Sequence, residues 1–332
     1  MRISLLFLFH SIFLTGFLMI SGVVFAQGEY DAYDMVISES YPSPGEYVDF
    51  TITSNKSFVS SIQSVAWYID GVEQVAYANK TKITEIAGGV PKRINAQIRY
   101  FNSRGERKAT SIAQWIRPAI FDILWEADSV VTPLYRGHRL AGPQTPITFS
   151  AKIQYIDQNG VVYTEKDFSF RWMIESRYHD DRGPGMSSVI YEKGGSYLNK
   201  YIIVQAETTL ISNGEVSFEK VINVPIIEPR LLVYPHTLLY GLSRDRVVSQ
   251  NLSLGSEEVT ASVYPFYFSQ SDFTKNAIQY KWFVNNQTSH LKEGRKLDIS
   301  IQGGGTDIPV RVFAQNENKD LQQSTIQLTF RL

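Results

Sequence analysis

The sequence contains no cysteine among its 332 residues. This absence excludes disulfide bonds, thiol nucleophiles and zinc sites with cysteine ligands. Exported sandwich domains without cysteine are unusual in eukaryotes and ordinary in bacteria, so we expect a bacterial source. With 43% hydrophobic and 13% aromatic residues, the protein has enough apolar material to build a core without covalent or metal support.

The sequence also lacks an excess of charge of either sign. The formal net charge is -1 at pH 7 and the isoelectric point is near 6.5. Proteins that bind nucleic acids usually carry clustered basic surface. We therefore expect no nucleic-acid partner.

Motifs of common catalytic sites are missing as well. The sequence has no HExxH, no phosphate-binding glycine-rich loop with lysine, no GxGxxG and no GxSxG. The histidines beyond the N-terminal segment are widely spaced, at His138, His179, His236 and His290. Because a catalytic triad is assembled in space, a hydrolase stays an alternative that requires a polar cleft joining a histidine to a nucleophile. We predict no enzyme activity and no cofactor.

A long hydrophobic run is present at the N-terminus. Residues 3–28 follow Arg2 without a single acidic or basic charge, and Ala26 occupies the small-residue position expected at a cleavage site. The pattern predicts a signal peptide over residues 1–26 and export to the cell envelope, the cell surface or the medium. The run also reaches the roughly 20 residues that cross a bilayer. An uncleaved N-terminal membrane anchor is therefore the alternative.

Three tryptophans mark an internal repeat. Trp67, Trp172 and Trp282 each lie in a short run of alternating inward and outward residues, the period of a half-buried strand. A glycine pair follows each tryptophan after 21 or 22 residues, and a further predicted strand follows each pair. We interpret the tryptophans as core anchors and the pairs as turns that use positive φ. The pairs are Gly88 and Gly89, Gly194 and Gly195, and Gly303 and Gly304; the strands after them cover residues 93–101, 201–208 and 309–315.

The repeat predicts an all-β protein. Each copy spans about 100 residues, a normal size for one β-sandwich. The order of strand, turn, tryptophan strand, hairpin and final strand is typical of an Ig-like sandwich. We predict three tandem Ig-like β-sandwich domains after the signal segment, over residues 30–116, 117–227 and 228–332.

The second repeat contains the stretch that fits a sandwich least. Residues 177–185 read as an extra loop after the tryptophan strand, and we predict that this loop contacts a partner protein. An alternative is a metal site at His179, Asp180 and Asp181, although a charged loop with neighbouring arginines is more often simply solvated. The predicted contact residues are Arg177, Tyr178, His179, Asp180, Asp181 and Arg182.

The third repeat contains four aromatic residues within five positions. Tyr264, Phe266, Tyr267 and Phe268 are candidates for a face on which a sugar stacks, and the alternative is a place in the core or in a contact between domains. A secreted carbohydrate-binding module, with a glycan as its partner, is thus the second function considered.

The tryptophan strand, the glycine pair and the next strand resemble the tandem bacterial Ig-like and PKD-like modules of exported surface proteins. The third repeat, notably residues 228–231, 264–268 and 280–282, is similar to envelope proteins of small-genome candidate-phylum bacteria. The Gly-Asp-Gly signature of PKD modules is absent, which favours the broader Ig-like assignment. The resemblance implies a structural, adhesive or assembly role through contacts with envelope or surface-assembly proteins, by loops at domain ends or by sheet edges.

Overall fold

The computed structural model describes the protein from Tyr33 to Arg331 with several gaps. The predicted signal segment lies outside the described residues. In the part of the sequence that is described, no helix has the length and apolar character needed to cross a bilayer. The described ranges are 33–54, 62–102, 104–131, 135–192, 200–237, 241–243, 247–248, 251–253, 258–285, 287–288, 294–300 and 307–331.

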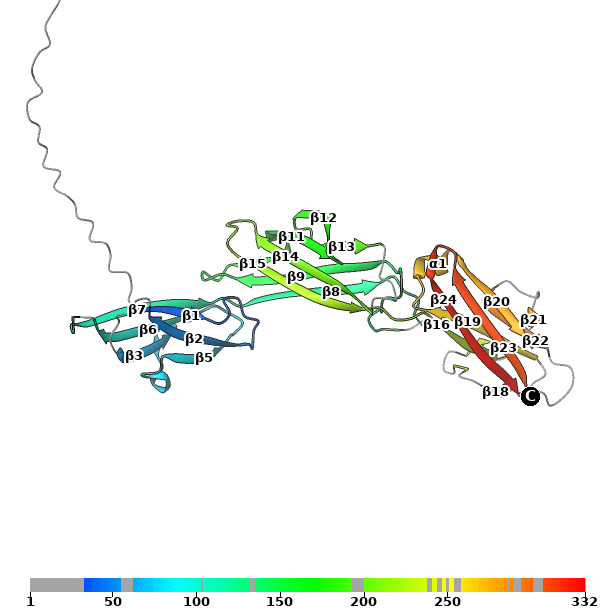
Figure 1. The fold of residues 1–332 in the computed structure, drawn as a ribbon, viewed down its shortest axis with the longest axis horizontal. Coiled ribbons are helices and arrows are strands. Elements are labelled where there is room, and N and C mark those ends of the chain that lie inside the picture. The colour runs from blue at the N-terminus through cyan, green and yellow to red at the C-terminus, as the bar shows by residue number, and fades with distance from the viewer. Residues whose placement is uncertain are drawn as a thin grey trace, which may run out of the picture. The chain divides into compact units, whose positions relative to one another are not determined.

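The chain divides into two compact units. The first contains residues up to 40 together with 46–87 and 92–116, and the second contains 41–45, 88–91 and 117–332. One pair of facing sheets builds the first unit, and two pairs build the second (Figure 1).

The first unit is a single sandwich of two antiparallel sheets. Its strands alternate buried and exposed residues, as in β2, where Val48, Phe50 and Ile52 point into the core. Trp67 on β3 is fully buried between the sheets. One sheet has the order β1 (Tyr33–Ile37), β2 (Tyr47–Ser54), β5 (Lys82–Ile86), and the other β4 (Val72–Glu73), β3 (Ile62–Ile69), β6 (Lys92–Phe101), β7 (Arg107–Ile116).

The second unit begins with a sandwich of the same strand order. Its core contains Trp172, Phe149 and Phe170, each 0 to 1% exposed. In one sheet β9 (Ile147–Ile156) pairs with β8 (Ala119–Ala127), β10 (Val162–Thr164) and β13 (Ser188–Tyr191). The other sheet has the order β12 (Arg177–Pro184), β11 (Phe168–Ile174), β14 (Tyr201–Leu210), β15 (Ser217–Pro225).

The third sandwich completes the second unit. Its core includes Trp282, Phe268 and Phe330, and a five-residue helix, α1 (Gln270–Thr274), connects its two sheets. One sheet has the order β17 (Gly241–Leu242), β16 (Arg230–Thr237), β19 (Glu258–Phe266), β22 (Lys296–Ser300). The other has the order β18 (Asn251–Ser253), β24 (Lys319–Arg331), β23 (Ile308–Asn316), β20 (Ile278–Val284), β21 (Gln287–Thr288).

The same topology therefore occurs three times. In each sandwich the tryptophan strand is flanked by a hairpin strand on one side and by the strand after the glycine pair on the other; the hairpin strand has two residues in the first and third sandwiches and eight in the second. A buried tryptophan on the third main strand, between sheets of this order, is the Ig-like arrangement. The predicted all-β fold of three tandem Ig-like sandwiches is confirmed, whereas the exact domain boundaries stay a prediction.

Each tryptophan strand ends in a two-residue hairpin turn. Ile69 pairs with Val72, Ile174 with Arg177 and Val284 with Gln287. Turns of this length use positive φ at the connecting residues because that twist matches the strands. The first turn uses Asp70 and Gly71 at φ 48° and 83°, and the third begins with Asn285 at φ 50°. The second uses Glu175 and Ser176 at φ 49° and 62°, residues that tolerate this conformation poorly.

The described glycine pair does not make the turn that the sequence predicted. Gly88 and Gly89 lie between β5 and β6, and neither has a positive φ. The two strands belong to facing sheets, so the backbone passes from one sheet to the other and has no tight reversal to make. Gly194, Gly195, Gly303 and Gly304 lie outside the described residues.

Candidate functional site

The stretch predicted to be a contact loop is a strand. Arg177 to Pro184 form β12, which pairs with the tryptophan strand β11 and places His179 opposite Trp172. The tight turn at Glu175 and Ser176 sends the backbone straight back along β11, so residues that look irregular in the sequence join the sheet. β12 is an edge strand of its sheet.

Side chains at the start of β12 are held by neighbours within the sandwich. The ring of His179 lies edge-on to that of Tyr191, 5.6 Å between centroids, and Arg171 lies 5.7 Å from the ring centre of Tyr178. The Tyr191 hydroxyl donates to Glu175 Oε2 at 2.8 Å. Burial, aided by this carboxylate, raises the pKa of Tyr191 to about 12. The side chains of Asp180, Asp181 and Arg182, and with them the alternative metal site, lie outside the described residues.

The three repeat tryptophans are buried and also hydrogen-bonded. Trp67, Trp172 and Trp282 are 0%, 0% and 1% exposed. Their indole Nε1 atoms donate to the carbonyls of Lys80 at 2.8 Å, Met186 at 3.4 Å and Gly294 at 3.0 Å. Each indole therefore ties its strand to a connecting segment that lies outside the main sheets.

The histidines were the basis of the hydrolase alternative. His236 Nε2 lies 2.7 Å from Ser262 Oγ on the neighbouring strand. Burial and the nearby Lys296 lower the pKa of His236. Ser262 faces away from the core, between the inward-facing Ala261 and Val263, and neither member of the pair lines a cavity described below. His290 lies outside the described residues.

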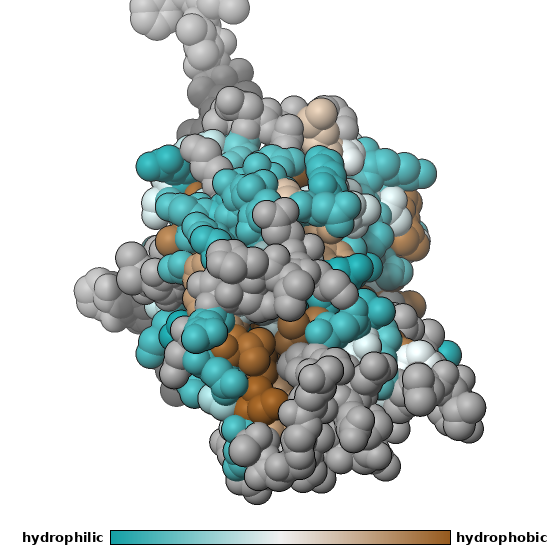
Figure 2. Space-filling model, turned by 90° about the vertical axis from the view of Figure 1, so that its right-hand side faces the viewer, coloured by the Kyte–Doolittle hydropathy of each residue, from teal (hydrophilic) through white to brown (hydrophobic). Residues whose placement is uncertain are grey.

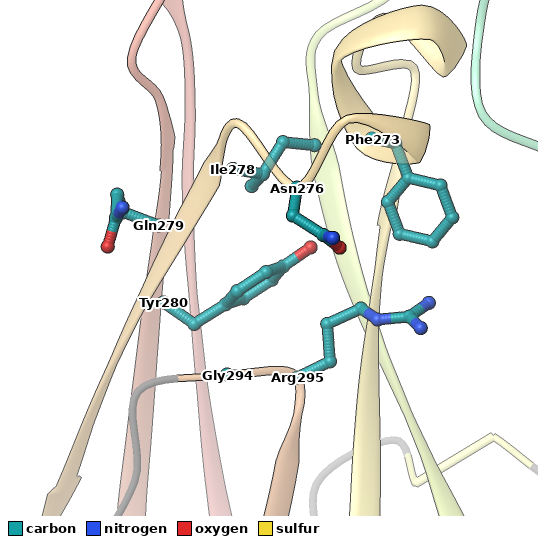
Figure 3. A pocket seen from close by; sticks show the side chains of 7 residues that line it. All are labelled: Phe273, Asn276, Ile278, Gln279, Tyr280, Gly294 and Arg295. Atoms are coloured by element: carbon teal, nitrogen blue, oxygen red, sulfur yellow. The ribbon is translucent and has the colours of Figure 1, made fainter.

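A cavity of about 290 Å³ opens at one end of the third sandwich, where α1 leads into β20 (Figure 3). Ser269 caps α1 by accepting from the Asp272 backbone N–H, and Asn276, at φ 55°, turns the backbone into β20. The lining residues come from α1, the start of β20 and the segment before β22. They are Phe273, Asn276, Ile278, Gln279, Tyr280, Gly294 and Arg295.

Tyr280 gives this cavity its unusual chemistry. The residue is 7% exposed, and its hydroxyl is buried without a hydrogen-bond partner in the described structure. Figure 3 shows the hydroxyl and the Asn276 amide pointing toward the same space. Burial raises the pKa of the phenol above its usual range despite the opposing charge of Arg295, so the group is a neutral donor at physiological pH.

Arg295 provides the positive charge beside the cavity. Its guanidinium lies 4.6 Å from the ring centre of Phe273 and 5.5 Å from that of Tyr264. Two aromatic faces restrict the guanidinium while its N–H groups stay available at the edges. No carboxylate is among the described residues that line the cavity.

Sequence reasoning missed this cavity, although the repeat carried a signal for it. The residue two positions before each tryptophan points into the core and is Val65, Phe170 or Tyr280. The third repeat alone has a hydroxyl at this position, and a hydroxyl in a core needs a partner.

A buried polar network joins residues 128–145 to the third sandwich. Gln322, fully buried, donates through Nε2 to the Pro143 carbonyl at 2.6 Å and accepts from Asn316 Nδ2 at 2.8 Å and from the Ser269 N–H at 2.9 Å. Gln144 adds two bonds, from Nε2 to Asp320 at 2.8 Å and from the Leu321 N–H to Oε1 at 3.0 Å.

Two further features of this junction restrict substitution. Asp272 accepts from Asn316 and Asn318 at 3.0 Å each and lies 3.6 Å from Lys319 Nζ. Burial opposes ionisation of Asp272, but these partners outweigh it and lower its pKa. A Cβ at Gly142 would overlap the Tyr267 carbonyl oxygen, so only glycine fits there.

The aromatic run in the third repeat does not form a stacking face. Phe268 is fully buried and Phe266 is 9% exposed, while Tyr264 and Tyr267 are half-buried. Tyr264 is further covered by Arg295 and by the edge of Tyr234. The carbohydrate alternative therefore loses the exposed surface on which the sequence interpretation placed it.

A shallow groove in the second sandwich also contains an aromatic side chain, which is partly buried against the core. Its volume is about 620 Å³, and it contains Trp125 together with Glu126, Asp128, Arg139 and Lys152. The Trp125 ring meets the His138 ring edge-on at 4.0 Å. The described residues on the face drawn in Figure 2 are mainly hydrophilic, apart from a small apolar area.

No protein-family model matches the sequence, and no curated protein sequence matches it. Solved structures align with it only loosely. The three N-terminal domains of the Highly Immunogenic Outer Capsid protein of bacteriophage RB49 align at TM-score 0.27 and 9% identity, over 91% of this chain and 99% of that one.

Two other alignments are of the same quality. Sidekick-1 immunoglobulin domains 1–5 align at TM-score 0.29 and 11% identity, over 92% of this chain and 60% of that one. The mixed-linkage glucan utilization locus protein SGBP-B of Bacteroides ovatus, solved with a mixed-linkage heptasaccharide, aligns at TM-score 0.21 and 9% identity, over 91% and 71%. Scores this low carry no argument, and the fold assignment depends on the sheets and cores described above.

Proposed function

We propose that this chain is a non-enzymatic bacterial protein, exported to the cell envelope or cell surface, with a structural, adhesive or assembly role based on protein–protein contacts. The Ig-like fold hosts many such roles, but fold alone is weak support. The observation that carries the proposal is the buried polar network that makes the second and third sandwiches one compact unit. A protein that holds partners at a fixed separation requires such a junction, and a lone binding module does not.

Burying the polar groups of this network costs free energy unless each of them is hydrogen-bonded. Gln322, Asn316 and Asp272 are all buried, and each is hydrogen-bonded. Domains joined in one polypeptide ordinarily move relative to one another unless their interface is extensive and well packed. A satisfied polar network specifies one arrangement, because any other leaves buried groups unpaired. The junction therefore favours a structural or assembly role.

The test is crosslinking and mass spectrometry on intact cells, after separation of membrane from medium. We expect the protein in the envelope fraction, crosslinked to envelope or surface-assembly proteins. Gln322→Ala should lower the yield of those crosslinks, whereas Gln323→Ala, at an exposed neighbouring position, should leave it unchanged. Free protein in the medium without crosslinks would contradict the proposal.

A carbohydrate-binding role is the second candidate, and the Trp125 groove is the observation that favours it. An indole beside acidic and basic side chains offers both a stacking surface and hydrogen bonds to hydroxyl groups. A glycan array should then give a signal that Trp125→Ala removes. An array without signal would leave the protein-contact role alone.

A further inference from the structure

The Tyr280 hydroxyl is a buried polar group that the fold itself does not use. Nearly all buried polar side-chain atoms in folded proteins have a hydrogen-bond partner, so an exception requires an explanation. The hydroxyl is unpartnered in the described structure and points into the cavity beside α1 (Figure 3). A ligand that supplies an acceptor there would complete its hydrogen bonding.

Packing does not require this hydroxyl. The equivalent positions in the other two sandwiches hold Val65 and Phe170, which are 2% and 1% exposed, and both sandwiches form the same core around their tryptophan. Phenylalanine would fill the position in the third sandwich equally well. The hydroxyl therefore has a role at the cavity and not in the core.

Three groups around the cavity can donate hydrogen bonds, and one of them is charged. Tyr280 offers an O–H, Asn276 an amide N–H₂ and Arg295 a guanidinium. The Gly294 carbonyl already accepts the Trp282 indole N–H at 3.0 Å. Donors and a positive charge, without an acid among the described lining residues, select an anionic acceptor.

The geometry of Arg295 narrows the choice of anion. Because Phe273 and Tyr264 lie against the guanidinium at 4.6 and 5.5 Å, contact is made at its edges, where a planar fork of N–H groups matches a carboxylate. The cavity, about 290 Å³, is at the lower limit for small-molecule sites and fits a group the size of one side chain.

We propose that this pocket binds a carboxylate group presented by a protein partner, from an acidic side chain or from a free C-terminus. Arg295 and the Asn276 amide hold the carboxylate at the mouth, and Tyr280 donates to it from within. The charge of Arg295 gives selectivity, because a neutral amide in the same place would form no ion pair with the guanidinium and would direct N–H donors toward the donors of Tyr280 and Arg295.

The indole of Trp282 reports directly on this pocket, and the repeat provides its controls. Trp282 Nε1–H donates to Gly294, a lining residue, while Trp172 and Trp67 donate to Met186 and Lys80 in the other sandwiches. In the full-length protein labelled with ¹⁵N at the indole nitrogens, we would titrate sodium acetate against sodium chloride at equal ionic strength. The next probes are the acetylated peptides Gly-Glu-Gly-amide, Gly-Gln-Gly-amide and Gly-Gly-Gly with a free C-terminus.

We expect acetate and at least one carboxylate peptide to shift the Trp282 signal in a saturable way, with the Trp172 and Trp67 signals unchanged. The two carboxylate peptides distinguish a side-chain source from a C-terminal one. Tyr280→Phe and Arg295→Met should each weaken binding at least tenfold. Arg311→Met is the matched control, because Arg311 stacks on Phe283 at 4.4 Å but does not line the pocket, and it should bind as the parent does.

Several results would overturn the proposal. They are the absence of saturation with acetate and both carboxylate peptides, an equal response to the glutamine peptide, and full affinity in a folded Tyr280→Phe protein. Saturation by glucuronate but by neither peptide would replace the protein partner with an acidic sugar. Because Tyr280→Phe removes an unpaired hydroxyl and keeps the ring, loss of binding in this variant will not reflect unfolding, and a Trp282 signal at its folded position without ligand checks this.

Discussion

The second and third sandwiches share a topology but differ in what they bury. The second surrounds Trp172 with the rings of Phe149, Phe168 and Phe170. The third has Tyr280 in place of Phe170 and adds the buried polar residues Asp272, Asn316 and Gln322 near α1. Since both versions support the same sheets, the polar groups of the third are not requirements of the fold. These polar groups lie at the junction with residues 128–145 and at the cavity beside α1.

The two sandwiches also differ in their hairpins. The third begins its turn with Asn285, a residue suited to positive φ, whereas the second uses Glu175 and Ser176. The second sandwich therefore has a strained turn, and the third has a well-suited turn and a group of buried polar residues near α1. The following experiments separate these contributions.

The largest effect is expected at the tryptophans, where the two sandwiches should agree. Trp172→Ala and Trp282→Ala each remove a buried ring and an indole hydrogen bond, and each should lower the free energy of unfolding by about 3–5 kcal/mol. Urea unfolding followed by circular dichroism measures both. A loss under about 1 kcal/mol in either would show that its core does not depend on the indole.

Phe170 and Tyr280 each lie two positions before a tryptophan, and replacing each by the other's residue type should change stability in opposite directions. Phe170→Tyr adds a hydroxyl at a position that is 1% exposed and should cost about 1–3 kcal/mol, while Tyr280→Phe removes an unpaired hydroxyl and should stabilise by about 1 kcal/mol. Thermal unfolding of both variants gives the comparison. Destabilisation by Tyr280→Phe would mean that the hydroxyl has a structural partner.

The polar junction should respond to loss of one member. Gln322→Ala leaves the Pro143 carbonyl, the Ser269 N–H and Asn316 without this partner, and it should cost about 1–3 kcal/mol. Gln323→Ala, at an exposed position on the same strand, should stay within about 0.5 kcal/mol of the parent. Equal effects of the two variants would contradict a special role for the network.

Acid should weaken the third sandwich through Asp272. The pKa of Asp272 in the folded protein is lowered, so its contribution to stability is complete above the unfolded value of about 3.9 and is lost as the pH falls through the folded value. Urea unfolding between pH 6 and pH 2 should show this loss, and Asp272→Asn should flatten it. Asp122→Asn, which removes an exposed partner of Lys220, serves as the control and should keep the parental pH dependence.

The smallest effect is expected at the strained turn. Ser176→Gly relieves the left-handed conformation at φ 62° and should stabilise by about 0.5–1 kcal/mol. Glu175 is kept, because its carboxylate accepts from Tyr191. Unchanged or lower stability in a thermal melt would show that the turn stores no strain.

Sequence periodicity was sufficient for the fold class, since the tryptophan strands repeat with the alternation that a two-sided sheet requires. The sequence interpretation failed where a segment was assigned from its own residues alone, without the strand that it pairs with. Residues 177–184 look like a charged loop because Glu175 and Ser176 are not typical hairpin residues, yet pairing with β11 makes them a strand. The reason is that β propensity depends on neighbours across the sheet more than on the residue itself.

The sequence by itself determined the apolar spacing and the three tryptophan anchors, because each depends on residues close together in the sequence. Only the tertiary structure decided that Gln322 meets Pro143, and that the Tyr280 hydroxyl has no partner. Contacts between residues far apart in the sequence leave no periodic trace. Whether a buried polar group is satisfied depends on such contacts, and this is what locates the junction and the pocket.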